Sequence, residues 1–195
     1  MHRLLEESKR IKVQADRILK ESGIIEILKD YGEIKIGGSY HLDVMLRPDL
    51  DFFVVREKHD YEKLINIVSK LIASKYFYEV NTVNQLDLKT SEWQVNLKGF
   101  YLAVKCEIDG VIWKIDIWLI SPEYDKTTEL TEHFMKLLQQ EIDDLKRIAI
   151  LEIKDAMRQG EKYIKGVDGG LIYGAVLESG VSDVEDFKKF LQSRK

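Results

Sequence analysis

Two carboxylates stand two residues apart at the start of an apolar strand. Asp49-Leu50-Asp51 leads directly into the apolar run 52–55. In an extended backbone alternate side chains share a face, so Asp49 and Asp51 lie side by side while Leu50 points into a core. Adjacent carboxylates repel each other, and proteins normally tolerate them where a divalent cation lies between them. Because Mg²⁺ prefers carboxylate oxygens and keeps positions open for water and phosphate, the pair predicts a metal–nucleotide site.

A turn of small residues, Ile36-Gly37-Gly38-Ser39, precedes the two acids along the chain. Glycine at Gly38 would allow the backbone to approach a phosphate closely, and the Ser39 hydroxyl with nearby amides could donate hydrogen bonds to it. An ordinary turn is the alternative interpretation, because such residues are common in loops.

A later strand carries a third acid. The ten-residue run Val111–Ile120 is apolar except for Lys114 and Asp116, which are two residues apart and therefore share a face. On that same face lie Ile112 and Trp118, which argue against a solvent-exposed edge strand. Asp116 is the candidate third carboxylate, while Lys114 could contact a phosphate or pair with a carboxylate.

These features together resemble the nucleotidyltransferase motif of the DNA polymerase β superfamily. Its pattern is an apolar residue, Gly, then Gly or Ser, a short spacer, acid–apolar–acid–apolar, and a third acid on a later neighbouring strand. The resemblance covers residues 32–120. It implies transfer of a nucleoside monophosphate from a nucleoside triphosphate, ATP among them, to a hydroxyl with release of pyrophosphate.

The resemblance also implies roles for single residues. Catalysis and metal binding fall to Asp49, Asp51 and Asp116, with two Mg²⁺ ions expected and both residues of the pair able to bridge them. Asp116 would hold the ion at the acceptor hydroxyl, act as base toward that hydroxyl, or both. Nucleotide binding is expected of four further residues, Gly38, Ser39, Arg47 and Lys114, although the favoured interpretation of Arg47 is a solvated loop residue.

Hydrophobic periodicity predicts an α+β fold: a mixed, largely antiparallel sheet of the nucleotidyltransferase type with helices on one side, then a helical C-terminal region. We expect a catalytic domain over 1–122 and helices over 123–195. The predicted helices cover residues 3–29 with a break at Ser22-Gly23, 60–74, 127–157, 171–177 and 182–192, the last with a Ser182 capping box. In the helix at 60–74 we expect Asp60 to be the cap and the buried stripe to consist of Leu64, Ile65, Val68, Leu71 and Ile72. The predicted strands cover 33–37, 50–55, 76–80, 92–97, 100–108 and 111–120, the last two joined by a tight turn at Asp109-Gly110.

Composition sets limits on partners and location. The 195 residues are 45% hydrophobic and 33% charged, and the formal net charge of −4 provides no overall basic field, which disfavours nucleic acid as the main partner. A single cysteine, Cys106, excludes an intramolecular disulfide. The N-terminus is charged rather than signal-like, and no apolar run reaches the length of a membrane span, so we expect a cytoplasmic protein without a membrane partner.

Three functions remain open at this point. The first is an enzyme that modifies a hydroxyl of a small molecule or protein, which the acidic balance favours. The second is a nucleotide- or protein-binding module with the same fold and no turnover, which the complete set of three acids disfavours. The third is an enzyme that adds nucleotides to an RNA end, for which a basic stripe would be expected.

Overall fold

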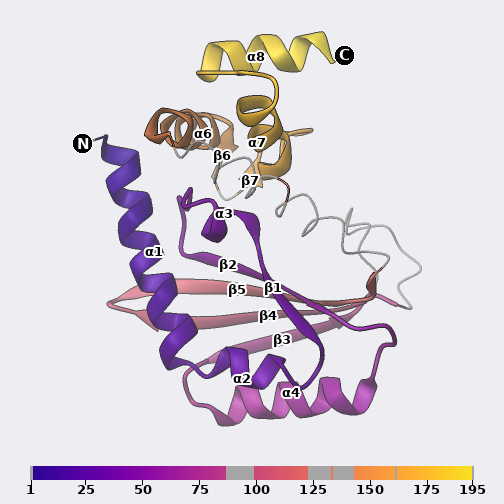
Figure 1. The fold of residues 1–195 in the computed structure, drawn as a ribbon. Coiled ribbons are helices and arrows are strands. Elements are labelled where there is room, and N and C mark those ends of the chain that lie inside the picture. The colour runs from indigo at the N-terminus through magenta and orange to yellow at the C-terminus, as the bar shows by residue number, and fades with distance from the viewer. Residues whose placement is uncertain (1, 87–98, 123–132, 134–142, 161, 195) are drawn as a thin grey trace. The chain divides into compact units, whose positions relative to one another are not determined.

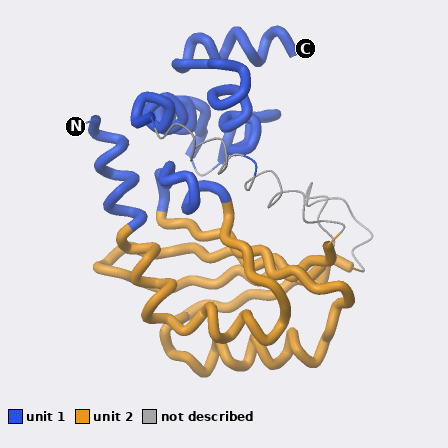
Figure 2. Tube along the Cα trace, in the orientation of Figure 1, with its two compact units in different colours: residues 1–12, 38–47, 130–195 blue, residues 13–37, 48–129 orange. Residues whose placement is uncertain are grey.

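The computed structural model describes residues 2–86, 99–122, 133, 143–160 and 162–194. The chain divides into two compact units, shown in Figure 2. The sheet unit contains residues 13–37 and 48–129, and the helical unit contains residues 1–12, 38–47 and 130–195. The division therefore groups two N-terminal segments with the C-terminal helices, while the predicted domain boundary after residue 122 stays a prediction.

The sheet unit is built on five strands in the order β1-β2-β5-β4-β3. Only β2 and β5 run parallel, and every other neighbouring pair in this sheet is antiparallel, which confirms the predicted mixed, largely antiparallel sheet. The strands are β1 Glu33–Ile36, β2 Asp49–Val55, β3 Glu79–Asn84, β4 Gly99–Ile108 and β5 Val111–Ile120.

Two helices of this unit, α2 (Ile24–Leu28) and α4 (Tyr61–Ala73), cover one face of the sheet (Figure 1). The left-handed Gly23 separates α2 from α1 (Arg3–Glu21), as predicted. The core side of β5 is fully buried at alternate positions, Trp113, Ile115, Ile117 and Leu119. The intervening side chains of β5, among them Asp116, therefore point to the opposite face.

The hairpin between β4 and β5 forms as predicted. Asp109 and Gly110 have φ angles of 52° and 76°, both in the left-handed region that a type I′ turn requires. The predicted strand at 76–80 was placed too early, because β3 begins at Glu79. The predicted strand at 92–97 lies outside the described residues.

The apolar stripe of α4 is narrower than its sequence indicates. Ile67 and Leu71 are buried, whereas Ile65 and Ile72 are 66% and 61% exposed. The predicted stripe included both exposed residues and omitted Ile67. Positions 67 and 71 lie one helical turn apart on the buried face, whereas positions 65 and 72 lie about 120–140° around the helix from that face, toward solvent. Asp60 caps the helix as predicted, accepting a hydrogen bond from the Lys63 amide.

The helical unit has its own core. It contains α3 (Gly38–His41), α6 (Asp144–Ala156), a small hairpin of β6 (Arg158–Gln159) and β7 (Lys162–Tyr163), α7 (Gly169–Leu177) and α8 (Val184–Ser193). Its buried core residues include Leu4, Leu5, Leu42, Val44, Ile150, Ile153, Ile172 and Phe187. The helical C-terminal region predicted from sequence is thus confirmed, although most of 127–143 lies outside the part of the chain that can be compared.

The last helix begins one residue later than its sequence indicates. The side chain of Asp183, not of Ser182, accepts the capping hydrogen bond, from the amide of Asp186 at 2.9 Å. Ser182 donates instead to the Asp186 carboxylate. An aspartate and a serine both cap helices well, so a sequence in which they are adjacent leaves the starting residue open.

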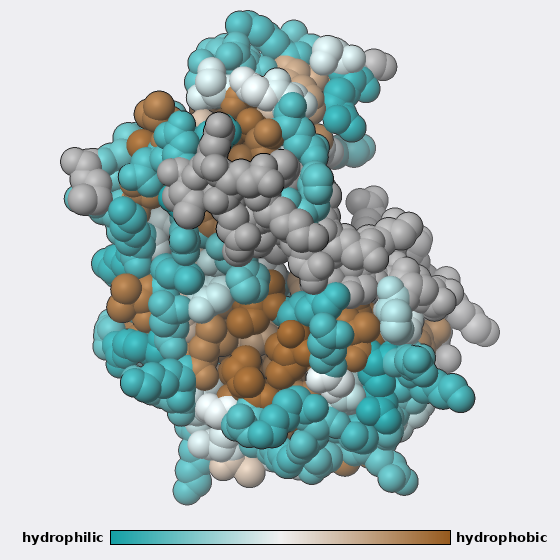
Figure 3. Space-filling model, in the orientation of Figure 1, coloured by the Kyte–Doolittle hydropathy of each residue, from teal (hydrophilic) through white to brown (hydrophobic). Residues whose placement is uncertain are grey.

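Among the described residues, none of the helices combines the length and the apolar character that crossing a membrane requires. Hydrophilic residues cover much of the surface visible in Figure 3, and a hydrophobic patch is visible within the sheet unit.

Candidate active site

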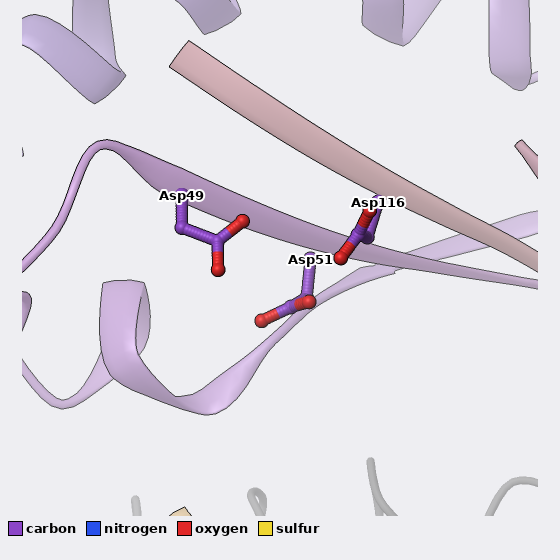
Figure 4. Close-up of side chains that lie close together, drawn as sticks. All are labelled: Asp49, Asp51 and Asp116. Atoms are coloured by element: carbon purple, nitrogen blue, oxygen red, sulfur yellow. The ribbon is translucent and has the colours of Figure 1, made fainter. Parts of the chain in front are cut away.

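The parallel pairing of β2 with β5 brings the three acids together. In its register Asp51 lies opposite Asp116, and Asp49 lies opposite Lys114. Each of the three aspartates offers a carboxylate oxygen within 4.8 Å of the others, and all three are partly buried. Figure 4 shows Asp49 and Asp51 projecting from one strand toward the side on which Asp116 projects from its neighbour. The start of β2 is held by a hydrogen bond from the Lys114 amide to the Pro48 carbonyl, 3.0 Å.

This donor set fits a divalent cation. Magnesium–oxygen distances of about 2.1 Å place two oxygens of one ion at most about 4.2 Å apart. The carboxylate oxygens, which lie within 4.8 Å of one another, are therefore near the separation that a shared ion requires. Hard carboxylate oxygens are also the ligands that Mg²⁺ and Mn²⁺ prefer. In the described part of the chain, no other group of three or more His, Cys, Asp or Glu side chains has such geometry.

Asp116 is held on both of its oxygens by side chains from the sheet. The Tyr101 hydroxyl donates to Oδ1 at 2.6 Å, and the Lys114 ammonium donates to Oδ2 at 2.6 Å. The Tyr101 ring lies against the Trp118 ring, with centroids 4.6 Å apart. Tyr101 is on β4, one strand further from β2, so this hydroxyl is a site residue that sequence reasoning missed. The only signal for it was the hairpin register, which places position 101 beside 118 and diagonal to 116.

The negative charge of the site shows in the pKa values of these two neighbours. Burial raises the pKa of Tyr101 well above its usual value, and the hydrogen bond to Asp116 together with the charges of Asp49 and Asp51 raises it further. Burial by itself would lower the pKa of Lys114, but the hydrogen bond and charge of Asp116, with the other two carboxylates, raise it overall. Tyr101 therefore stays a neutral donor and Lys114 a cation at neutral pH.

Gly37 makes the closest approach to the acidic strand. Its amide donates to the Asp51 carbonyl at 2.7 Å, and a β-carbon added at Gly37 would lie 2.6 Å from the Asp51 β-carbon. Only glycine leaves room for Asp51 at this point. Sequence reasoning assigned the close-approach role to Gly38, toward a phosphate, and overlooked this packing role of its neighbour.

The helical unit contains three of the four predicted nucleotide-binding residues, Gly38, Ser39 and Arg47, and the sheet unit contains the fourth, Lys114, on β5. Gly38 and Ser39 open α3, and their carbonyls accept hydrogen bonds from the amides of Leu42 and Val44. The Arg47 guanidinium donates to the Gly160 carbonyl, within the helical unit. Lys114 is the one of the four whose side chain contacts an acid of the cluster, Asp116.

Asp43, in the spacer between turn and acids, anchors its own loop. It has a φ of 54°, and its carboxylate lies 3.4 Å from the Lys12 ammonium and 3.8 Å from the Arg147 guanidinium. The Ser8 hydroxyl donates to its carbonyl. These contacts show that Asp43 anchors its loop.

Comparison with known proteins supports the fold. No protein-family model matches the sequence. No curated protein matches it either. Among solved structures, the Cid1 poly(U) polymerase with Mg and 3′-dATP bound is similar with a TM-score of 0.50 and 16% identity, covering 75% of this chain and 41% of that chain.

Two further structures are similar at the same level. A second structure of Cid1, described for its RNA terminal uridylyl transferase activity, has a TM-score of 0.56 and 15% identity, covering 87% of this chain and 47% of that chain. The poly(A) polymerase complex GLD-2–GLD-3 has a TM-score of 0.53 and 12% identity, covering 94% of this chain and 61% of that chain. The chain thus spans less than two thirds of the length of these proteins. At such identities the likeness establishes the fold, and the predicted nucleotidyltransferase fold is confirmed.

Proposed function

We propose that this protein transfers a nucleoside monophosphate from a nucleoside triphosphate to a hydroxyl group and releases pyrophosphate. The observation that carries the proposal is the meeting of Asp49, Asp51 and Asp116 across two parallel strands, with carboxylate oxygens within 4.8 Å. Three partly buried carboxylates so close together repel each other and destabilise a protein unless a cation neutralises their charge. Because the donor set consists of oxygen atoms only, it supports binding of a divalent cation such as Mg²⁺.

In the proposed site, Asp49, Asp51 and Asp116 would hold the two expected Mg²⁺ ions. Bound there, the ions would neutralise phosphate charge and lower the pKa of the acceptor hydroxyl. The carboxylates orient the reacting groups, since phosphoryl-type displacement depends on positioning and charge more than on a covalent catalyst. In this proposal Asp116 also accepts the proton of the acceptor hydroxyl, and the hydrogen bond from Tyr101 keeps that carboxylate in a fixed orientation.

The triphosphate is held, in this proposal, by the segment that follows β1. The Gly38 backbone and the Ser39 hydroxyl supply hydrogen bonds to phosphate oxygens, and Arg47 and Lys114 supply positive charge. Support for this comes from chain order: Gly37 packs directly on Asp51, so the next two residues leave the sheet from a point beside the acids.

The acceptor is proposed to be a hydroxyl of a small molecule or a protein, because the formal net charge of −4 does not favour a polyanion. An RNA end is the second candidate. This candidate is favoured by the similar solved structures, which are described as a poly(U) polymerase with RNA terminal uridylyl transferase activity and as a poly(A) polymerase complex.

The test is transfer of label from each of the four nucleoside triphosphates, α-³²P-labelled, with Mg²⁺, to three acceptor sets. These are a panel of hydroxylated small molecules, the protein itself with other proteins, and short RNAs with a free 3′ hydroxyl. Asp51→Asn is the inactive variant, because the amide keeps size but loses the charge that binds metal. Asp109→Asn is the matched control, since this acid lies in the β-turn and pairs with Arg17 instead.

Transfer that Asp51→Asn abolishes and Asp109→Asn retains would support the enzyme, and the labelled acceptor would identify the substrate class. Triphosphate binding that is independent of metal and unchanged in Asp51→Asn, with no transfer to any acceptor, would refute the proposal and favour a binding module.

A further inference from the structure

Lys114 stands where a metal would have to bind. Its ammonium lies 2.6 Å from Oδ2 of Asp116, and its backbone lies opposite Asp49 in the parallel register. Its ammonium is therefore a cation in direct contact with the three-acid cluster. A lysine ammonium is a compact point charge, and it can take the place of an ion at a carboxylate oxygen.

The two hydrogen-bond partners of Asp116 differ in how firmly they are held. Tyr101 is 7% exposed and its ring packs on Trp118, so its hydroxyl has little freedom to leave. The Lys114 side chain is half exposed, at 50%, whereas that of Asp116 is 13% exposed. A long, solvated side chain can swing away at small cost, and exposed ion pairs are weak.

We infer that Lys114 is a built-in counter-ion of the metal site, which pairs with Asp116 in the metal-free protein, competes with the divalent cation, and is displaced when the cation binds. This inference rests on the metal site of the proposed function and assigns Lys114 an additional role in it. The ammonium and a divalent cation repel each other at the same carboxylate, so both cannot contact it closely. Displacement frees the ammonium beside the site, where an incoming triphosphate would bring new negative charge.

A counter-ion of this kind reduces the electrostatic repulsion among the three carboxylates of the metal-free protein. Three carboxylates within 4.8 Å of one another would repel strongly in the metal-free protein. One ammonium offsets part of that repulsion and fixes the position of Asp116 between turnovers.

The test measures Mn²⁺ affinity of the whole, metal-free protein without nucleotide, by isothermal titration calorimetry at pH 7. Lys114→Met keeps the length of the side chain and removes its charge. We expect it to bind Mn²⁺ about tenfold more tightly than the wild type, because the competing cation is gone. Mg²⁺ should likewise raise the melting temperature of Lys114→Met by more than that of the wild type.

Lys105→Met is the matched control. Lys105 lies directly opposite Lys114 on the neighbouring strand, but its ammonium pairs with Glu79 at 2.9 Å. Its substitution removes the same charge from the same sheet and should leave Mn²⁺ affinity within about twofold of the wild type, as expected for a charge outside the site. In the Asp116→Asn background, Lys114→Met should change the affinity much less, because the shared partner is gone.

The outcomes separate this inference from the proposed function. Equal or weaker Mn²⁺ binding by Lys114→Met, with binding by the wild type intact, would overturn the counter-ion role alone. An effect of the same size in Lys105→Met or in the Asp116→Asn background would also overturn it. Tighter binding by Lys114→Met in a protein that transfers no nucleotide would uphold the counter-ion and refute the enzyme. If neither wild type nor Lys114→Met bound metal, both would fall.

Discussion

Replacing Gly37 by alanine should damage the site without changing any of its chemical groups. The added β-carbon would lie 2.6 Å from the β-carbon of Asp51 and 3.3 Å from its carbonyl oxygen. The two carbons must separate by about 0.8 Å to reach an ordinary van der Waals contact. Neither is the end of a flexible side chain, so β1 and β2 must move apart or Asp51 must tilt. The short hydrogen bond from the Gly37 amide to the Asp51 carbonyl would be strained by either response.

The displacement sets the expected magnitude. Overpacking of this kind costs about 1–3 kcal/mol of the free energy of unfolding. A misplacement approaching 1 Å of a group that positions the reaction lowers a rate by about 10²-fold. We therefore expect Gly37→Ala to fold, with a lower urea midpoint, weaker Mn²⁺ binding, and nucleotidyl transfer reduced by about 10²-fold.

The assay compares urea unfolding, Mn²⁺ titration and transfer rate in Gly37→Ala with those in Gly169→Ala. Gly169 opens α7, and a β-carbon there would meet only the far end of the Tyr173 side chain, at 3.3 Å. Wild-type metal affinity and transfer rate in Gly37→Ala would show that Gly37 does not constrain Asp51, and the packing argument would be refuted.

Three other changes have distinct expected outcomes. Asp116→Asn should lower transfer by about 10²-fold or more while the melting temperature of the metal-free protein changes little, because one repelling carboxylate is removed; a collapse of that temperature would mark a structural role instead. Asp168→Ala removes the side chain that accepts from the Leu171 amide at 2.7 Å and should cost about 1 kcal/mol in urea unfolding, with Asp168→Asn nearer the wild type. Burial raises the pKa of Cys106 to about 11, so the unfolded chain loses this proton first, and the free energy of unfolding should fall as pH rises above 9.0; in a Cys106→Ala protein the decline should begin only near pH 10.0, where Tyr101 with its raised pKa starts to contribute.

Much of the fold could be predicted from patterns among residues that are neighbours in the sequence. The alternation of β5 placed Asp116 and Lys114 on one face, and Asp109-Gly110 determined the hairpin, because both signals depend on neighbouring residues only. The helix caps at Asp60 and the break at Gly23 were likewise readable. One error arose where two neighbouring residues cap a helix almost equally well, as Ser182 and Asp183 do at the start of α8. Another arose where burial depends on what packs against a helix, as at Ile65 and Ile72 of α4.

The sequence by itself determined which three carboxylates were candidates, since the spacing of Asp49 and Asp51 and the isolated acid in an apolar strand are properties of the chain alone. Only the tertiary structure decided that β2 pairs in parallel with β5 in the register that sets Asp51 opposite Asp116. It also decided that Tyr101 and Lys114 share Asp116, and that Gly37 packs on Asp51. Strand pairing over such separations depends on the burial of whole faces of the sheet, and no short stretch of sequence encodes it.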